Sequence, residues 1–456
     1  MAQIKPFRGL RYAPGVGPLA DLVTPPYDVI DAKAQDGYYR RHPYNIIRLE
    51  YGKVYPGDNE NNNRYTRAAA DFNAWLEKGV LVPDKSPSLY LYEQEFDVGG
   101  RRQVRSGMFC AVKLEPYEKG VILPHEETLP KHKADRLDLM RACRANFSPI
   151  FGLYADEEMT VDGLLRRERD RQPELAFTDE NGHDHRMWVI SNPAIIEQVQ
   201  QAMAGKRIYI ADGHHRYETA LAYSRERRRE EGDPEGARPY DYVMMTLVNL
   251  YDPGLVVLPT HRLVRNVVNL DVEELLDRIQ EHFQVEAFPL APDRSNFTGF
   301  IRELASRGGF TGDDRPAADP RTRRHCFGLY CGSGRLYFLT LRDEGALTRL
   351  MPAGHSAAWQ GLDVSVLHHL ILDRLLGIGG EQRAKESHLT YTRKEVEALK
   401  AVDEGEYQLA FFLNPTLVEE VTAVAASGEK MPQKSTFFYP KLITGLVINP
   451  LFAINS

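Results

Sequence analysis

The sequence lacks several features that would define a protein class at once. No uninterrupted apolar run reaches the ~20 residues that a membrane-spanning helix needs. The first residues, from Met1 to Pro6, lack the apolar core of a signal peptide. Only four cysteines occur among 456 residues, which is typical of reduced thiols rather than of a disulfide framework. We therefore expect a cytoplasmic protein without a membrane partner.

The sequence also has no excess of positive charge. Lys and Arg number 57 against 64 Asp and Glu, which gives a net charge of −7. Nucleic acids and anionic membranes bind positively charged surfaces, so we expect no nucleic-acid partner. The 43% hydrophobic and 27% charged residues are ordinary for a globular protein, and the length suggests two or three domains at roughly 150 residues each.

Strand and helix signals alternate through most of the chain. Ser191, followed by Pro193, predicts a capped helix that stops at Gly205, and an amphipathic pattern predicts another helix from Asp363 to Leu376. Strands are predicted where runs are rich in β-branched, aromatic or aliphatic residues, namely at 88–96, 107–114, 186–190, 207–211, 241–250, 335–341 and 407–413. Because the two kinds of element are mixed, we expect an α+β fold with a mixed sheet.

The most informative stretch is a short apolar strand that runs into a tight turn and then a helix. The turn is Asp212-Gly213, so His214, His215 and Arg216 fall in the first helical turn. Backbone amides and the positive end of the helix dipole favour an anion there, Gly213 lets the backbone approach it, and Arg216 can grip two phosphate oxygens. Helix starts ordinarily favour acidic residues, so this cationic turn indicates a phosphate site. The alternative is a turn whose histidines cap neighbouring carbonyl groups.

A second stretch, residues 123–136, is dense in ionisable groups and has prolines near both ends, which is typical of a loop with a fixed path. Glu126 or His125 suits a general base, whereas Lys131 and Arg136 suit phosphate. We expect this loop to face the loop at residue 212. A solvated surface loop is the alternative.

Thr260, His261 and Arg262 follow the apolar run Leu255–Leu258. We expect their polar groups at a strand end, where ligands often bind in α/β proteins. They would complete an anion pocket, although an exposed loop is an equally good interpretation.

No spacing of metal ligands stands out. His325, Cys326 and Cys331 form the nearest group, but no second pair of ligands follows, and structural zinc sites usually have closer cysteine pairs. We therefore expect no structural metal. The chain also lacks the Gly-rich P-loop motif.

The stretch Ala211–Glu218 resembles the nucleotide-binding loop of the ParB/sulfiredoxin-like superfamily. The whole chain, moreover, is similar to the bacterial and archaeal family catalogued as domain of unknown function 1015. The segments that carry the family resemblance run from one end of the chain to the other: Leu22–Ile30, Pro43–Leu49, His125–Thr128, Asp135–Leu137, Leu258–Arg262 and Met431–Lys441.

The superfamily contains nucleotide-gated DNA partition proteins, sulfinic-acid reductases and an archaeal kinase that acts on free serine. Sulfiredoxin-like enzymes place a reactive cysteine directly before the histidine-arginine pair, where this chain has His214. Reductase chemistry therefore lacks its nucleophile. The resemblance implies the kinase-type loop.

These observations together predict a phosphate-handling enzyme. The favoured reaction is nucleotide-dependent phosphoryl transfer to a small hydroxylated metabolite such as serine, with Mg²⁺ and a nucleotide such as ATP or ADP. The alternatives are a phosphatase or other hydrolase that uses the same anion pocket, and a nucleotide-sensing module that binds another protein. We expect residues 1–265 to form a ParB/sulfiredoxin-like nucleotide-binding region. Residues 266–456 would form an α/β C-terminal region that closes over the site or supports a homo-oligomer.

Overall fold

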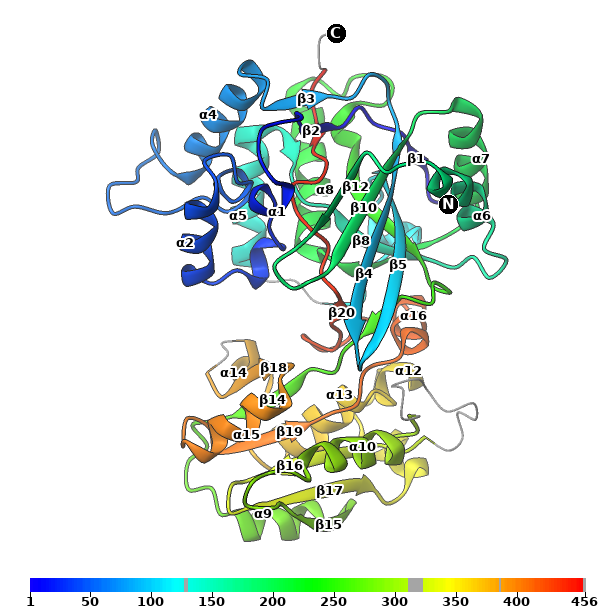
Figure 1. The fold of residues 1–456 in the computed structure, drawn as a ribbon. Helices are drawn as coiled ribbons and strands as arrows, with labels where there is room; N and C mark the ends of the chain where they lie inside the picture. Colours follow the sequence, from blue (N-terminus) through cyan, green and yellow to red (C-terminus); the bar gives the residue numbers. More distant parts are fainter. Residues whose placement is uncertain (127–129, 311–322, 385–386, 454–456) are drawn as a thin grey trace. The chain divides into compact units, whose positions relative to one another are not determined.

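The computed structural model describes residues 1–126, 130–310, 323–384 and 387–453. The chain divides into two compact units, drawn as ribbons in Figure 1. Unit 1 comprises Met1–Pro124, Thr128–Val256 and Pro440–Ser456, and unit 2 comprises His125–Glu127 and Val257–Tyr439. The last segment of the chain therefore returns to the first unit.

Unit 1 is built on a nine-stranded mixed sheet with the strand order β6-β11-β8-β12-β5-β4-β10-β9 and with β1 beside β5. The pairs β6–β11 and β8–β12 are parallel, and the other neighbours are antiparallel. The α+β prediction with a mixed sheet is thus confirmed. The strands are β1 (Ile4–Lys5), β4 (Leu89–Val98), β5 (Arg101–Lys113), β6 (Ile122–Leu123), β8 (Ile150–Tyr154), β9 (Leu175–Thr178), β10 (Asp184–Ile190), β11 (Ile208–Asp212) and β12 (Tyr242–Asn249).

Helices enclose two cores in unit 1. One core lies between the sheet and three helices, α6, α7 and α8, and the second lies around α3, α4 and α5. Lys133 of α5 is ion-paired with Glu218 of α8, so these two helices lie side by side. The helices are α1 (Leu19–Leu22), α2 (Ala32–Arg41), α3 (Ile47–Glu50), α4 (Arg64–Glu77), α5 (Pro130–Cys143), α6 (Thr160–Arg166), α7 (Pro193–Met203) and α8 (His214–Glu230).

Short strand pairs complete unit 1. β2 (Leu10–Tyr12) pairs with β3 (Leu81–Pro83), and β7 (Ala145–Asn146) pairs with β21 (Asn449–Pro450). The second pair attaches the end of the chain to the segment that follows α5. No helix among the described residues is long and apolar enough to cross a membrane.

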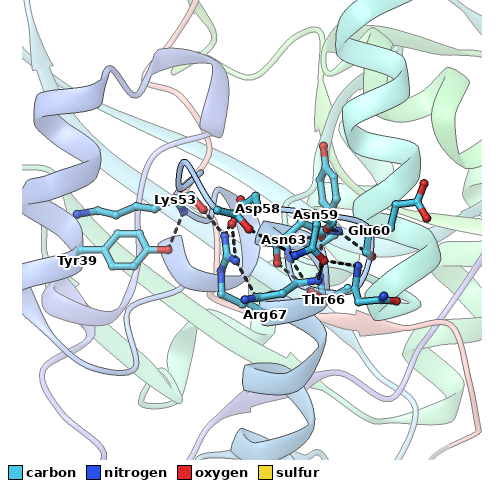
Figure 2. A network of polar contacts seen from close by, with 12 residues as sticks. Tyr39, Lys53, Asp58, Asn59, Glu60, Asn63, Thr66 and Arg67 are labelled. Carbon is cyan, nitrogen blue, oxygen red and sulfur yellow. Dashed lines mark hydrogen bonds and ion pairs between the residues drawn. The ribbon is translucent and has the colours of Figure 1, made fainter.

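The loop before α4 is held by the network in Figure 2. Arg67 forms two ion-pair contacts with Asp58, at 2.8 and 2.9 Å, and donates to the carbonyl of Lys53 at 2.9 Å. The Asn63 side chain caps the helix, and the Thr66 hydroxyl accepts a hydrogen bond from the Asn63 backbone in return. This reciprocal cap fixes where α4 begins.

Unit 2 contains a six-stranded antiparallel sheet with the order β15-β17-β16-β19-β14-β18. Alternate residues of each strand point to opposite faces, and each face is covered. On β16, Phe327 and Leu329 join one core with α9 and α13, whereas Cys326 and Tyr330 join another with α10 and α15. The strands are β14 (His261–Val264), β15 (Phe283–Pro289), β16 (Cys326–Tyr330), β17 (Arg335–Leu341), β18 (Leu389–Thr392) and β19 (Leu409–Phe412).

The remaining elements of unit 2 are mostly short helices. They are α9 (Val272–Ile279), α10 (Phe297–Arg307), α11 (Leu347–Leu350), α12 (Ala357–Gln360), α13 (Asp363–Val366), α14 (Gly380–Ala384), α15 (Glu395–Asp403) and α16 (Val418–Ala426).

Most local predictions agree with the structure. All seven predicted strands overlap observed ones, and the helix after Ser191 is α7, although Asn192 rather than Ser191 supplies the cap. The helix predicted from Asp363 is α13 followed by a π-helical segment, Leu367–Asp373. A wider turn of this kind does not follow from an amphipathic pattern.

Gly152 sits in the middle of β8, between β11 and β12. A Cβ atom there would lie 2.7 Å from a methyl carbon of Leu247 and 2.9 Å from one of Ile208. Both distances are shorter than side chains tolerate without a shift, so the absence of a side chain lets the three strands pack closely.

We expect Gly152→Ala to lower the free energy of unfolding by about 1–3 kcal/mol, because overpacking displaces neighbouring side chains. Gly37→Ala in α2 is the matched control, since a Cβ there meets no atom within 4 Å. It should stabilise by about 0.5–1 kcal/mol, because alanine is the better helix former. Urea unfolding followed by tryptophan fluorescence measures both. A free energy of unfolding of Gly152→Ala equal to that of the wild type would contradict this packing.

Candidate functional site

The predicted phosphate loop is a bulged strand end that leads directly into α8. The register between β11 and β8 shifts between Ile210 and Asp212, which re-aims the Asp212 side chain. Gly213 then adopts φ 95°, a left-handed conformation, and α8 begins at His214. A Cβ on Gly213 would also lie only 3.0 Å from the guanidinium of Arg216. Both the backbone and the close approach therefore require glycine.

The carboxylate of Asp212 is held between two cations. Its Oδ1 accepts from Lys441 Nζ at 2.6 Å, and its Oδ2 accepts from Arg216 Nη2 at 2.8 Å. Burial acts to raise the pKa of Asp212, but Lys441 and Arg216 outweigh burial and hold the pKa well below its ordinary value. The carboxylate is therefore ionised, and two cations, Lys441 and Arg216, stand against this one anion beside the start of α8.

Arg216 is buried and anchors the loop to the neighbouring strand. Its Nη1 donates to the carbonyl of Pro149 at 2.6 Å, just before β8 begins. The guanidinium thus joins the end of β11 to the start of β8 through its Nη2 and Nη1 atoms. That it also grips phosphate oxygens stays a prediction.

Lys441 belongs to the segment that returns to unit 1, and a second buried arginine holds that segment. Arg105 of β5 donates to the carbonyl of Pro440 at 2.6 Å, and Gln94 donates to the carbonyl of Lys441 at 3.0 Å. Burial lowers the pKa of Arg105 to about 10, which leaves it charged at neutral pH. The backbone around Lys441 is therefore fixed before any ligand binds.

A cavity of about 40 Å³ lies on the other side of Arg216, with Glu50, Arg136 and Ser148 in its lining. Arg136 Nη1 is 3.3 Å from Glu50 Oε1, and the Ser148 hydroxyl donates to the same oxygen at 2.8 Å. Arg136 also lies 4.0 Å from the ring centre of Tyr27. The volume has room for a water molecule or two, so this cavity supports the loop and is too small for a nucleotide.

Unit 2 contains a second polar cluster, built around the backbone of Lys434. Its amide donates to Glu126 Oε1 at 3.0 Å, and its carbonyl accepts from Arg262 Nη2 at 3.1 Å. Lys434 has φ 57°, a left-handed conformation that is rare for a residue with a side chain. His125 Nε2 lies 3.0 Å from the Thr436 hydroxyl oxygen. One strained loop thus positions both predicted bases, Glu126 and His125.

Thr260 and His261 are also buried in unit 2, and they follow the short strand β13 (Val256–Val257), as expected. β14 begins at His261, so Thr260 directly precedes that strand and Arg262 lies within it. His261 Nδ1 accepts from the Leu413 amide at 3.2 Å, which places its proton on Nε2. Arg262 Nη1 donates to the carbonyl of Thr260. These side chains are engaged within the sheet.

The structure therefore groups the predicted residues unit by unit. Unit 1 contains Asp212, Gly213, His214, His215 and Arg216, together with Arg136 across the cavity. Unit 2 contains His125, Glu126, Thr260, His261 and Arg262. The side chain of Lys131 lies outside the described part of the chain. The expectation that the loop at residue 126 faces the loop at residue 212 stays a prediction.

Sequence reasoning missed the residues that support the loop from a distance. In the sequence, Lys441 is only the last residue of a family-like segment, and no motif marks Arg105 or Glu50. Arg105 follows the polar start of β5, Arg101–Gln103, so the sequence gives no signal that its side chain is buried.

The comparisons with known proteins agree with the family resemblance. The family model described as "Protein of unknown function (DUF1015)" matches residues 4–365. No curated protein matches the chain.

Several solved structures are similar to the chain. A conserved hypothetical protein from Pyrococcus furiosus is 14% identical with a TM-score of 0.31, over 75% of this chain and 95% of that one. A variant of a free serine kinase in complex with ADP is 14% identical with a TM-score of 0.33, over 75% and 93%. C-terminally truncated SbnI from Staphylococcus aureus is 14% identical with a TM-score of 0.33, over 74% and 87%.

The ion cluster predicts a specific response to acid. Because the pKa of Asp212 is lowered in the folded protein, its stabilisation is complete above the unfolded pKa of about 3.9 and is lost as the pH falls below that value. Asp212→Asn should cost on the order of 3 kcal/mol at neutral pH, since two buried cations lose their anion. The difference from wild type should shrink between pH 5 and pH 3.

Urea unfolding at each pH, followed by the fluorescence of Trp75 and Trp188 in unit 1, measures this difference. Asp97→Asn is the control, because the Asp97 side chain is 64% exposed. Its free energy of unfolding should equal that of the wild type at every pH. A difference between Asp212→Asn and wild type that stays constant with pH would show that the pKa of Asp212 is the same in the folded and unfolded protein, so that Lys441 and Arg216 do not lower it.

Proposed function

The chain belongs to the DUF1015 family of proteins of unknown function, and we propose that it transfers a phosphoryl group from a nucleotide to the hydroxyl group of a small metabolite such as serine. The observation that carries this proposal is the start of α8. There, a left-handed Gly213 opens the helix, and Lys441 and Arg216 outnumber the Asp212 carboxylate. This arrangement favours a bound anion.

The amides of the first helical turn and the ammonium of Lys441 would bind the phosphates. An α-helix leaves its first amides without partners in the helix, and a phosphate accepts from several of them at once. His215 is half-buried at the same turn and adds a ring donor. Positioned positive charge is the main requirement of phosphoryl transfer, because the protein has little covalent chemistry to perform.

Arg216 and Asp212 would act by positioning. Asp212 fixes the direction of the Lys441 ammonium, and Arg216 fixes Asp212 while it bonds to the carbonyl of Pro149. Side chains locked by such contacts need not reorganise when a ligand binds, which strengthens electrostatic stabilisation of developing charge.

The described residues fit Mg²⁺ only in part. Both oxygens of Asp212 already contact cations, so the phosphates and water would have to supply most of the ligands, as is common for this ion. When bound, Mg²⁺ would neutralise part of the negative charge of the phosphates.

A carboxylate or imidazole is also needed to accept the proton of the substrate hydroxyl. Glu126 remains our proposed base, with His125 as the alternative. The contact with the Lys434 amide holds Glu126 Oε1, so the second carboxylate oxygen is the one that would receive the proton.

We expect ATP or ADP, with Mg²⁺, to raise the melting temperature of the full-length protein. A ligand at 100 times its Kd stabilises by about 2.7 kcal/mol, which is readily measured by thermal unfolding. Lys441→Met should weaken binding roughly tenfold to hundredfold, because a charge-assisted hydrogen bond contributes about 1.5–3 kcal/mol.

Lys206→Met is the matched control. Lys206 also pairs with a carboxylate in unit 1, at 3.0 Å from Asp156, and is similarly buried, with 21% of its side chain exposed against 14% for Lys441. It should bind nucleotide like the wild type. Equal binding by all three proteins, or no binding by any, would overturn the phosphate site at α8.

Glu126→Gln separates transfer from binding. It should keep nucleotide binding and lose about 10²–10⁴-fold in the rate of serine phosphorylation, because only general base catalysis is removed. Release of inorganic phosphate without a phosphorylated acceptor would instead identify a hydrolase. Binding without turnover in the wild type would identify a nucleotide-sensing module.

A further inference from the structure

Three side chains of ligand type meet at the turn between β9 and β10 in unit 1, away from the start of α8. Oδ2 of Asp179 lies 3.3 Å from Nδ1 of His183 and 3.2 Å from Nε2 of His185. All three atoms lie within 4.8 Å of one another. His185 is completely buried, and the other two side chains are each 9% exposed.

The backbone of the turn prepares the Asp179 carboxylate. Its Oδ1 accepts from the amides of Asn181 at 2.8 Å and His183 at 3.0 Å, which leaves Oδ2 to face the imidazoles. Gly182 adopts φ 78° and allows the tight reversal. His183 and His185 are two residues apart as β10 begins, so their rings point to the same face. The short sequence from 179 to 185 thus sets all three positions.

A tyrosine on the neighbouring strand orients the buried imidazole. Nδ1 of His185 lies 2.7 Å from the hydroxyl oxygen of Tyr92 in β4. Nε2 therefore points at Asp179, yet no described residue completes a well-aligned hydrogen bond to it. A metal-binding histidine usually has its second ring nitrogen held by a hydrogen-bonding group, and Tyr92 would have that role for His185.

We propose that Asp179, His183 and His185 bind a divalent transition-metal ion of the zinc class. With metal–ligand bonds of about 2.1 Å at tetrahedral angles, two ligand atoms lie about 3.4 Å apart. The observed 3.2 and 3.3 Å match that spacing. Two imidazoles with one carboxylate suit zinc better than magnesium or calcium, which prefer oxygen ligands.

The ion would fasten the β9–β10 turn to the start of β10. Glu180, the next residue in the turn, contacts Tyr38 and Arg41 of α2, and Tyr92 lies in the middle of the sheet. Three protein ligands leave a fourth position for water. A His-x-His pair with an aspartate four residues before it lies outside the cysteine patterns on which the expectation of no structural metal rests.

The test uses untagged full-length protein, stripped with EDTA and then titrated with Zn²⁺ alone. We expect the wild type to bind one equivalent, measured by elemental analysis, and its melting temperature to rise by several degrees. Co²⁺ in place of Zn²⁺ should give visible absorption bands of a nitrogen- and oxygen-ligated site. Asp179→Asn and His183→Gln should lose the equivalent, the absorption and the temperature shift.

Two further variants keep the result interpretable if a ligand variant fails to fold. Tyr92→Phe retains every ligand and should weaken Zn²⁺ binding about 10–100-fold, because only the group that orients His185 is lost. His282→Gln removes a half-buried histidine of unit 2 and should bind like the wild type. The proposal would be overturned if the wild type took up no Zn²⁺ or Co²⁺. It would also be overturned if Asp179→Asn and Tyr92→Phe took up as much metal as the wild type. The three side chains would then form an ion-pair network only.

Discussion

The candidate site depends on one buried carboxylate that two cations share. Asp212 lies at the end of β11, the strand next to the edge of the sheet. An unpaired charge would be costly to bury there. Lys441 and Arg216 offset that cost, and Arg216 also bonds to the backbone before β8. Because each of the three groups satisfies another, the start of α8 is rigid and retains a net positive charge. We propose an anion site at the start of α8 from this arrangement.

This ion cluster also explains why the chain returns to its first unit. Lys441 is 229 residues from Asp212 in sequence, and it arrives only because residues 440–456 pack back into unit 1. Arg105 and Gln94 hold the backbone of that segment from inside the sheet. The long-range topology thus completes a loop whose other parts are consecutive in sequence.

Local features of the fold and the site could be predicted from sequence, and long-range features could not. The turn at Asp212-Gly213 and the helix that follows are determined by neighbouring residues, so their pattern is visible in a few letters. The partner of Asp212 is not, since no local pattern marks Lys441 as its contact. Sequence predicts Arg216 as a group that grips phosphate oxygens, but its burial beside Pro149 depends on how β8 packs against β11. The His-x-His pair after Asp179 was visible in sequence, but its closeness to Tyr92 required the strand register.

A crystal structure of the full-length protein with Mg²⁺ and ADP tests the central claim most directly. The account predicts nucleotide phosphate oxygens within hydrogen-bonding distance of the first-turn amides of α8 and of Lys441 Nζ, with Asp212 still bonded to Arg216. Nucleotide bound elsewhere on unit 1 or on unit 2, with the start of α8 in contact only with water, would contradict the account.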